Sequence, residues 1–251
     1  MKSLIAGFAA ATLLASAAVH AQGASNNFIG IGAGVFPKTP GNSNMTAIAL
    51  PVLQVSYEDK AYINGIRAGV WAFDADDKSL RIGLYAEPRF GYTGSDSTIT
   101  KGMTTRDFAI DLGPTVRWTT EAGTVNLDYG FDVTGKSKGQ VAQLQFVRPL
   151  VRQVGLVVNA SVQATWQSDK MNNYYWGVAS TETNVPIGRI AYTANSGTAV
   201  GAGLSGLYAF NPAGAMFFGA TLTRLSDAQY DSPIAERRYV PTLYLGYGWR
   251  M

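Results

Sequence analysis

The sequence predicts an all-β protein, namely a transmembrane, antiparallel, up-and-down β-barrel of about twelve strands, with ten as the alternative count. Three observations predict this fold: an amino-terminal export signal, apolar residues that recur at every second position, and strand lengths sufficient to cross a bilayer. The 251-residue chain contains no cysteine, so its stability has to come from burial and hydrogen bonding rather than from disulfides.

The amino terminus has the features of a secretory signal peptide. Lys2 supplies a short positive region, Leu4 to Val19 is apolar or small, and Val19-His20-Ala21 matches the small-x-small rule for cleavage. A retained transmembrane helix would need a longer apolar run. We therefore expect residues 1–21 to be removed and residues 22–251 to form one exported barrel domain.

The alternation is clearest in residues 124–135, TVNLDYGFDVTG. Val125, Leu127, Tyr129, Phe131 and Val133 occupy every second position, and polar residues or glycine fill the positions between them. A period of two places these two sets on opposite faces of a β-strand. The segment is therefore predicted to be a strand with one apolar and one polar face.

The same alternation recurs along the chain between turn-rich breaks. The predicted strands lie near residues 27–36, 46–57, 61–73, 80–92, 105–118, 123–134, 139–149, 155–167, 173–180, 198–210, 214–225 and 239–251. A soluble sandwich and a soluble barrel also alternate, but their strands cluster near five or six residues, whereas a tilted membrane strand needs about nine to eleven. No stretch after residue 21 approaches eighteen apolar residues, so a membrane location requires a closed barrel.

The breaks between predicted strands sort into short and long ones. Residues 58–60, 135–138 and 211–214 suit tight turns at one end of the barrel. Residues 179–197 and 226–238 are long and fall at the other end, which lies outside the cell if both termini are periplasmic. Residues 93–104 disagree, because they are long yet fall at the short-turn end in this count of strands.

The polar faces of the predicted strands carry charges of both signs. Isolated charges inside a narrow barrel are costly, so we expect a network of ion pairs and hydrogen bonds that fills the lumen. The candidate lumen residues are Arg67, Arg81, Glu87, Arg89, Asp111, Arg117, Asp128, Asp132 and Arg250. A filled lumen favours a structural or docking role, and a narrow diffusion channel is the alternative at this barrel size.

The last predicted strand ends at the carboxyl terminus, as is typical of outer-membrane barrels. Such barrels finish with aromatic residues at alternating positions, which the insertion machinery recognises. Gly246, Trp249 and Met251 fit this spacing, with Met251 in the place where an aromatic residue is usual.

The residue inventory argues against an enzyme. The one histidine, His20, lies in the predicted signal peptide, and without histidine or cysteine the common triads, thiol nucleophiles and zinc sites are not available. Asp128 and Asp132 share a face but stand about 13 to 14 Å apart along a strand, too far for a retaining glycosidase. We predict no catalytic, cofactor or metal site, and no long basic run indicates nucleic acid as a partner.

Several phrases together resemble the MipA/OmpV family of outer-membrane proteins. These are GMTTRDFAIDLG, DVTGKSKGQ, NYYWGVAS at residues 173–180, and LSDAQYDSPIAERR, in which Asp231, Ser232 and Pro233 form an outer-loop motif. The chain departs from the family at residues 37–42, which lack the usual tyrosine. The resemblance covers nearly all of the mature chain and implies an outer-membrane barrel.

The resemblance also implies a function and a set of partners. The founding member of the family is described as a scaffold that links a lytic murein transglycosylase to a murein synthase, and other members as adhesins or as contributors to antibiotic susceptibility. We therefore predict a non-catalytic scaffold in the cell outer membrane, in contact with lipid, lipopolysaccharide and the barrel-insertion machinery. A small-solute or drug-permeable channel and an adhesin that uses residues 179–197 and 226–238 are the alternatives.

Overall fold

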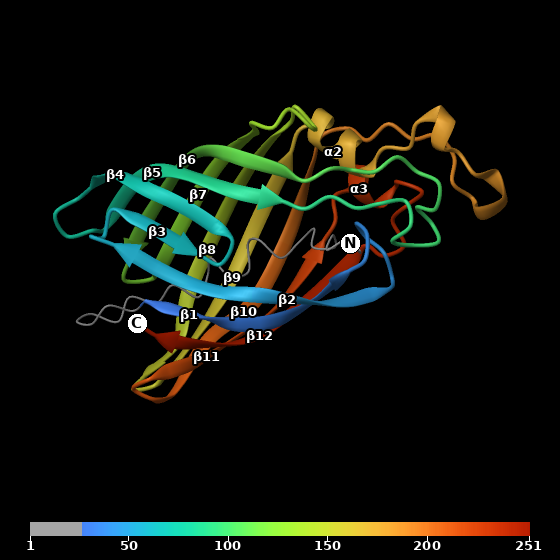
Figure 1. The fold of residues 1–251 in the computed structure, drawn as a ribbon. Helices are drawn as coiled ribbons and strands as arrows, with labels where there is room; N and C mark the ends of the chain where they lie inside the picture. The colour runs from blue at the N-terminus through green and yellow to red at the C-terminus, as the bar shows by residue number, and fades with distance from the viewer. Residues whose placement is uncertain (1–26) are drawn as a thin grey trace.

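A computed structural model describes residues 27–251 as one closed antiparallel β-barrel (Figure 1). The predicted signal peptide, residues 1–21, lies outside the described residues. Each strand pairs with its sequence neighbours, and β1 pairs with both β2 and β12, which closes the sheet. The strands are β1 (Phe28–Pro37), β2 (Met45–Tyr57), β3 (Ala61–Asn64), β4 (Arg67–Asp74), β5 (Leu80–Arg89), β6 (Ala109–Thr120), β7 (Gly123–Asp132), β8 (Gln140–Gln153), β9 (Leu156–Gln167), β10 (Gly197–Asn211), β11 (Gly214–Arg224) and β12 (Tyr239–Arg250).

Short helices occur only between strands in the described part of the chain. They are α2 (Asp169–Trp176), η1 (Ser180–Glu182), η2 (Val185–Ile187) and α3 (Asp227–Tyr230). Among residues 27–251, no helix combines the length and the apolar character that crossing a membrane would require.

The outer surface of the barrel is apolar and the inner surface is largely polar. Leu84, Leu204 and Leu245 point outward and are 50%, 51% and 54% exposed, whereas the inward-facing Asp128 and Ser205 are buried. Exposed apolar residues of this kind recur on every strand from β1 to β12. A soluble monomer does not present so continuous an apolar surface to water, so this band is suited to lipid. The predicted membrane barrel is thereby confirmed as the fold class.

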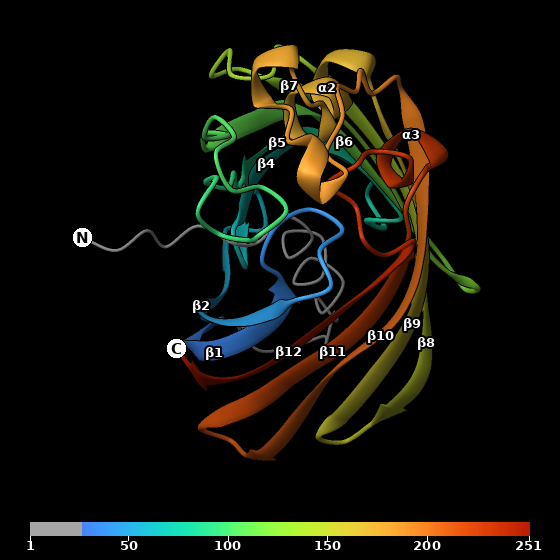
Figure 2. The same cartoon turned by 90° about the vertical axis from the view of Figure 1, so that its right-hand side faces the viewer.

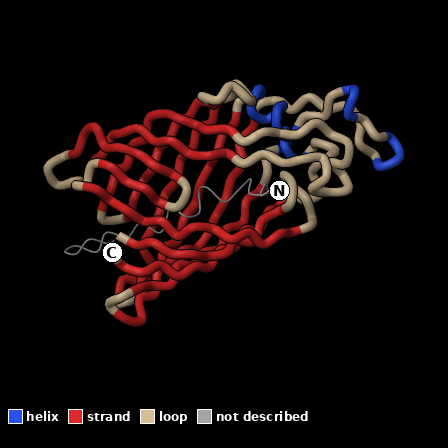
Figure 3. The backbone as a smooth tube through the Cα atoms, in the orientation of Figure 1, coloured by secondary structure: helices blue, strands red, loops and turns tan. Residues whose placement is uncertain are grey.

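The two ends of the barrel differ in their connections. The turns after β2, β4, β6, β8 and β10 are short and form what we call the turn end. The connections after β1, β5, β7, β9 and β11 gather, together with the helices of residues 27–251, at the opposite, loop end (Figure 3). Both ends of the described chain lie at the turn end, where the Met251 N–H donates to the carbonyl of Asn27 at 2.9 Å.

Two predicted strands were wrong, and the two errors cancel in the count. Residues 61–73 form the hairpin of β3 and β4 rather than one strand, because Gly65-Ile66 makes a two-residue turn in which Gly65 has a φ of +62°. Residues 173–180 begin inside helix α2 rather than forming a strand. The Ser168 hydroxyl accepts from the Met171 N–H and caps this helix.

The extra hairpin also corrects the assignment of connections to the two ends. It adds one crossing before residue 90, so the long segment 93–104 falls at the loop end with the other long loops. Residues 135–138 also lie at the loop end, against the prediction of a tight turn at the other end. There, Lys136 Nζ forms an ion pair with Asp107 Oδ2 at 2.9 Å.

The outward apolar band predicts that the destabilisation caused by an outward-facing charge depends on its depth in the bilayer. Leu204→Arg, near the middle of β10, should lower the free energy of unfolding by about 2–4 kcal/mol, because a cation at the bilayer midplane has no polar partner. The same change at the outward-facing Tyr239, the first residue of β12, should cost no more than about 1 kcal/mol. Urea titration of the protein folded into lipid vesicles measures both values, and equal costs at the two sites would contradict a lipid-covered barrel.

Candidate functional site

The centre of the lumen holds an ion-pair network built around Arg67. Its guanidinium lies 2.6 Å from Glu87 Oε2 and 2.7 Å from Asp128 Oδ2, and all three side chains are buried. The Thr115 hydroxyl donates to the second oxygen of Asp128 at 2.6 Å. Because β4, β5 and β7 each supply one charged member, the network joins β7 to two strands that are not its neighbours.

A second pair lies closer to the loop end of the lumen. Arg89 Nε donates to Asp111 Oδ2 at 2.9 Å, and the Arg89 guanidinium lies 5.9 Å from the ring of Tyr175 in helix α2. The network therefore continues from the barrel wall to the elements that cover the loop end.

Arginine side chains nearer the turn end are held partly by an aromatic ring. Arg81 and Arg117 lie 4.7 Å and 5.1 Å from the ring of Trp71. Arg81 also binds Asp74 through two N–H groups at 2.6 Å and 2.9 Å, and Arg117 donates to Asn126 at 3.1 Å. A cation above an aromatic face is stabilised by the ring quadrupole, which assists charges that are removed from water.

The structure does not bring all the predicted lumen charges together. Asp132 lies at the loop end of β7, where its Oδ2 accepts from the backbone N–H groups of Ser137 and Lys138 at 2.6 Å and 3.0 Å. Arg250 is exposed at the last position of β12, 5.5 Å from the ring of Phe28. Asp132 therefore organises a loop, and Arg250 lies at the rim of the barrel.

The residues of the predicted insertion signal are divided between the two faces of β12. Trp249 points outward and is 52% exposed, and Met251 follows the strand at 57% exposed. Gly246 faces the lumen, where a Cβ would come within 2.6 Å of Val52 Cγ2. Whether these residues act as an insertion signal stays a prediction.

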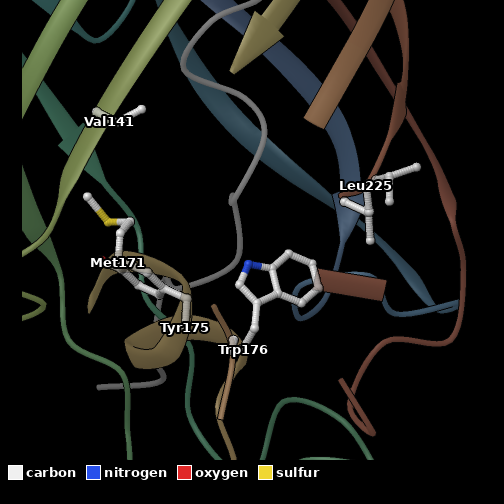
Figure 4. Close-up of a cluster of buried hydrophobic side chains, with 7 residues drawn as sticks. Val141, Met171, Tyr175, Trp176 and Leu225 are labelled. Carbon is white, nitrogen blue, oxygen red and sulfur yellow. The ribbon is translucent and has the colours of Figure 1, made fainter. Parts of the chain in front are cut away.

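The loop end is covered by a folded cap that the sequence did not predict. Figure 2 looks onto this end and shows α2, α3 and the long loops gathered over its upper part. Met171, Tyr175 and Trp176 of α2 pack in one buried cluster with Val141 of β8 and Leu225 after β11 (Figure 4). The helix is thus fixed to the barrel by apolar burial.

Buried polar contacts fix the loops of the cap to one another. Arg106 binds both oxygens of Glu182 at 3.0 Å and 2.9 Å, although the two residues are far apart in the sequence. Arg189 donates to the carbonyls of Glu182 at 2.7 Å and Lys101 at 3.1 Å. Charged hydrogen bonds of this kind in a desolvated setting give the cap a defined conformation.

Glu182 is held in its ionised form by these contacts. Burial by itself raises the pKa of its carboxyl, but hydrogen bonds from Arg106 and from the backbone N–H groups of Ala179 and Thr104 outweigh burial. Together they hold the pKa of Glu182 at about 2.

The predicted outer-loop motif is part of the cap. Ser232 is buried and donates its hydroxyl to the carbonyl of Trp176 at 2.5 Å, which joins the loop after α3 to the end of α2. Asp231 is exposed and ends α3. Serine at positions 168 and 226, directly before α2 and α3, is a signal from which these helices could have been predicted. No local signal marks the Arg106–Glu182 pair, which depends on the folded loops.

A cavity of about 140 Å³ lies between the ion-pair network and the cap. Its lining includes Arg67, Arg89 and Asp111 on one side and Trp176 of the cap on another. Glutamine and threonine side chains line much of the remaining wall, namely Gln143, Gln163, Thr165, Gln167, Thr221, Thr223 and Gln229.

Comparison with known proteins identifies similar chains. The family model described as MltA-interacting protein MipA matches residues 29–251. The MltA-interacting protein of Escherichia coli (strain K12) is 26% identical over 253 residues, which cover 100% of this chain and 98% of that protein. The outer membrane protein Omp26La of Vibrio anguillarum is 29% identical over 146 residues, covering 58% of this chain and 55% of that protein.

Among solved structures, a bacterial polysaccharide outer membrane secretin aligns with a TM-score of 0.45 and 9% identity. The alignment covers 91% of this chain and 100% of that one.

Removing only the cation of the Arg67 network should strongly destabilise the protein. Arg67→Met leaves Glu87 and Asp128 buried without their cation and should lower the free energy of unfolding by about 3–5 kcal/mol. Adding Glu87→Gln and Asp128→Asn should restore most of that loss, because no uncompensated charge remains.

Urea titration in vesicles measures these changes, and Lys78→Met provides the control. Lys78 pairs with Asp59 at the surface, where the two side chains are 47% and 56% exposed, so its loss should cost less than about 1 kcal/mol. A similar cost for Arg67→Met and Lys78→Met would show that the lumen pairs add nothing beyond surface pairs.

The cap should loosen in acid. The pKa of Glu182 in the folded protein, about 2, lies below its ordinary value of 4.5. The ionised carboxylate therefore contributes its full stabilisation of the cap above pH 4.5, and this stabilisation is lost as the pH falls from about 5 towards 2. In Glu182→Gln this part of the pH dependence should disappear. Amide hydrogen exchange of residues 99–106 and 179–189 monitors the cap, with Glu121→Gln at the turn end as control. An unchanged pH profile in Glu182→Gln would refute the assignment.

Proposed function

Because this chain belongs to the MltA-interacting protein MipA family, we propose that it is a non-catalytic outer-membrane barrel that docks murein enzymes at its turn end. The observation that carries the proposal is the full-length match to that family, together with a lumen whose central charges are paired and a cap that is internally bonded. Export through a cleaved signal peptide, residues 1–21, belongs to the same proposal.

We propose that the turn end faces the periplasm. Outer-membrane barrels with an even number of strands have short periplasmic turns and longer extracellular loops. Asn27 and Met251 lie together at the turn end of this barrel, and the long loops and the cap lie at the other. A partner that works on murein would therefore meet the turn end.

One arc of the turn end is acidic. The turns after β2, β4 and β6 are neighbours around the barrel and carry the exposed side chains of Glu58, Asp76 and Glu121. We define these three residues as the acidic turn arc. Complementary charge guides association and selects partners, so we propose that a basic surface of a lytic murein transglycosylase, or of a murein synthase, docks on this arc.

The residue inventory supports a non-catalytic role. Residues 22–251 contain neither histidine nor cysteine, which removes the side chains that most often act as bases and nucleophiles near neutral pH. The carboxylates Glu87 and Asp128 are both engaged in ion pairs with Arg67.

A narrow channel for small solutes is the second candidate function. The observation that favours it is the cavity between the lumen network and the cap, which has a volume of about 140 Å³. Stable, ion-selective conductance of the purified protein in planar bilayers would support this candidate over docking.

Docking should depend on the acidic turn arc. The triple variant Glu58→Gln, Asp76→Asn, Glu121→Gln should reduce co-purification of a lytic murein transglycosylase about tenfold at low salt, since three rim charges contribute about 1.4 kcal/mol together. The matched control removes three exposed acids at the loop end, through Asp107→Asn, Asp169→Asn and Asp231→Asn. Equal loss in both triple variants, or in neither, would refute docking on the arc.

A further inference from the structure

The wall of the barrel has a gap above the β3–β4 hairpin. Strand β2 pairs with β3 only from Gln54 to Tyr57, and its residues 45–53 pair with β1 alone among the described strands. On the other side, β5 pairs with β4 only as far as Ala86, and residues 87–89 pair with β6 alone. The hairpin ends early because β3 has only 4 residues (Figure 1). We call the space between these two unpaired edges the wall gap.

A proline stands on each edge of the wall gap. The Leu53 carbonyl accepts from the Gly65 N–H, so odd-numbered residues of β2 direct their backbone groups toward the hairpin, and Pro51 is one of them. The Leu80 carbonyl accepts from the Ala75 N–H, so even-numbered residues of β5 do the same, and Pro88 is one of them. Proline has no N–H, so each edge has one fewer donor that would need a partner in the gap.

The wall gap lies within the height of the hydrocarbon. A strand tilted by about 40° climbs about 2.5 Å per residue, and the apolar band of such a barrel is about 25 Å tall. Counted from Tyr57, an exposed aromatic residue at the turn end of β2, the band reaches Ala47. Residues 47–53 of the gap edge are therefore at the level of lipid chains.

The lumen cavity borders the wall gap. Its lining includes Glu87, Pro88 and Arg89, which are the residues of β5 that lie beyond its pairing with β4. The free edge of β5 in this structure is the side that borders the wall gap.

An apolar groove on the outside leads to the same place. It has a volume of about 530 Å³ and runs over the β3–β4 hairpin to Leu84, Ala86 and Leu112. Ala86 is the last residue of β5 that pairs with β4, so the groove ends where the wall gap begins.

The two sides of the lumen suggest what could enter. Part of the cavity wall is apolar, with Val141, Trp176 and Leu225, whereas the part beside the gap carries Arg89 and Asp111. These two charges neutralise each other. Asp111 Oδ1 is buried and has no hydrogen-bond partner among the described residues, so it could accept a hydrogen bond from a ligand.

We propose that the wall gap is a lateral entrance through which uncharged amphipathic molecules, with an apolar body and a hydrogen-bond donor, pass from the lipid phase into the lumen cavity. Balanced charges in the cavity disfavour ions, and an entrance at the level of the lipid chains selects molecules that dissolve there. This inference is independent of docking at the acidic turn arc.

Cysteine labelling tests the entrance, because the natural chain has no thiol. Thr165→Cys places one thiol in the cavity. In lipid vesicles, the apolar reagent pyrene maleimide, which dissolves in the bilayer, should label it at least tenfold faster than a sulfonated, water-soluble maleimide. Closing the gap should then slow pyrene labelling about tenfold and leave the sulfonated reagent unaffected.

Two variants close the gap. The first variant lengthens both strands of the β3–β4 hairpin by inserting four residues after Asn64 and four residues before Arg67. The inserted residues are valine at outward-facing positions and threonine at inward-facing positions. This extends the hairpin by about 13 Å and keeps the alternation of faces. The second, Ala49→Trp, places a large side chain at the mouth and should slow pyrene labelling about threefold. Its control is Ala220→Trp on β11, an outward position where both neighbouring strands are paired.

Folding of each variant is checked by its heat-modifiable migration on gels. If the insertion variant does not fold, Ala49→Trp alone tests the proposal. Pyrene labelling that is unchanged by closure, or that is slowed equally by Ala49→Trp and Ala220→Trp, overturns the proposal. Labelling of Cys at position 165 that is as fast from water as from lipid also overturns it, because the cavity would then open to the aqueous phase.

Discussion

The structure depends on one constraint, which is that backbone N–H and C=O groups in hydrocarbon must find partners within the protein. A sheet meets this requirement only by closing on itself, and the pairing of β1 with both β2 and β12 does so. The unpaired edges of β2 and β5, where the hydrogen-bond ladder of the barrel is incomplete, follow the same rule. Where the short β3–β4 hairpin leaves two edges, Pro51 and Pro88 each remove an N–H that would otherwise point into lipid. The wall gap is thus compatible with the constraint that shapes the rest of the barrel.

Inside the barrel the corresponding constraint acts on charge. A guanidinium or a carboxylate removed from water requires a partner at hydrogen-bond distance, and Arg67, shared by Glu87 and Asp128, meets this requirement across three strands. The cap follows the same logic in its loops, where Arg106 and Arg189 bind one carboxylate and several backbone carbonyls. Both sets of contacts restrict motion, so the lumen and the cap are preorganised. The exposed acidic turn arc and the wall gap are the places where we propose that this barrel meets other molecules.

The fold could be predicted from local patterns, whereas most of the candidate site could not. Alternation identified the face of nearly every strand, because a strand puts successive side chains on opposite sides irrespective of its neighbours. It failed at residues 61–73, where a two-residue turn shifts the outward positions from odd, as at Ile63, to even, as at Val70. It also failed at residues 173–180, where aromatic residues suit a strand or a buried helix equally. Among the candidate lumen charges, the sequence placed Arg67, Glu87 and Asp128 on inward faces. It could not separate them from Asp132, because Asp132 has the same parity and differs only in its position along β7.

The sequence by itself determined the fold class, the apolar outer face and the family, because these follow from residue order and from the two-residue period of an extended chain. Only the tertiary structure decided which charges meet, how the loops fold into a cap, and where the wall stays open. Those features depend on strand register and on the relative lengths of neighbouring strands, which bring together residues such as Arg106 and Glu182 from distant parts of the chain. Alternation carries no information about register, so no local pattern could have revealed that β2 and β5 extend beyond the hairpin between them.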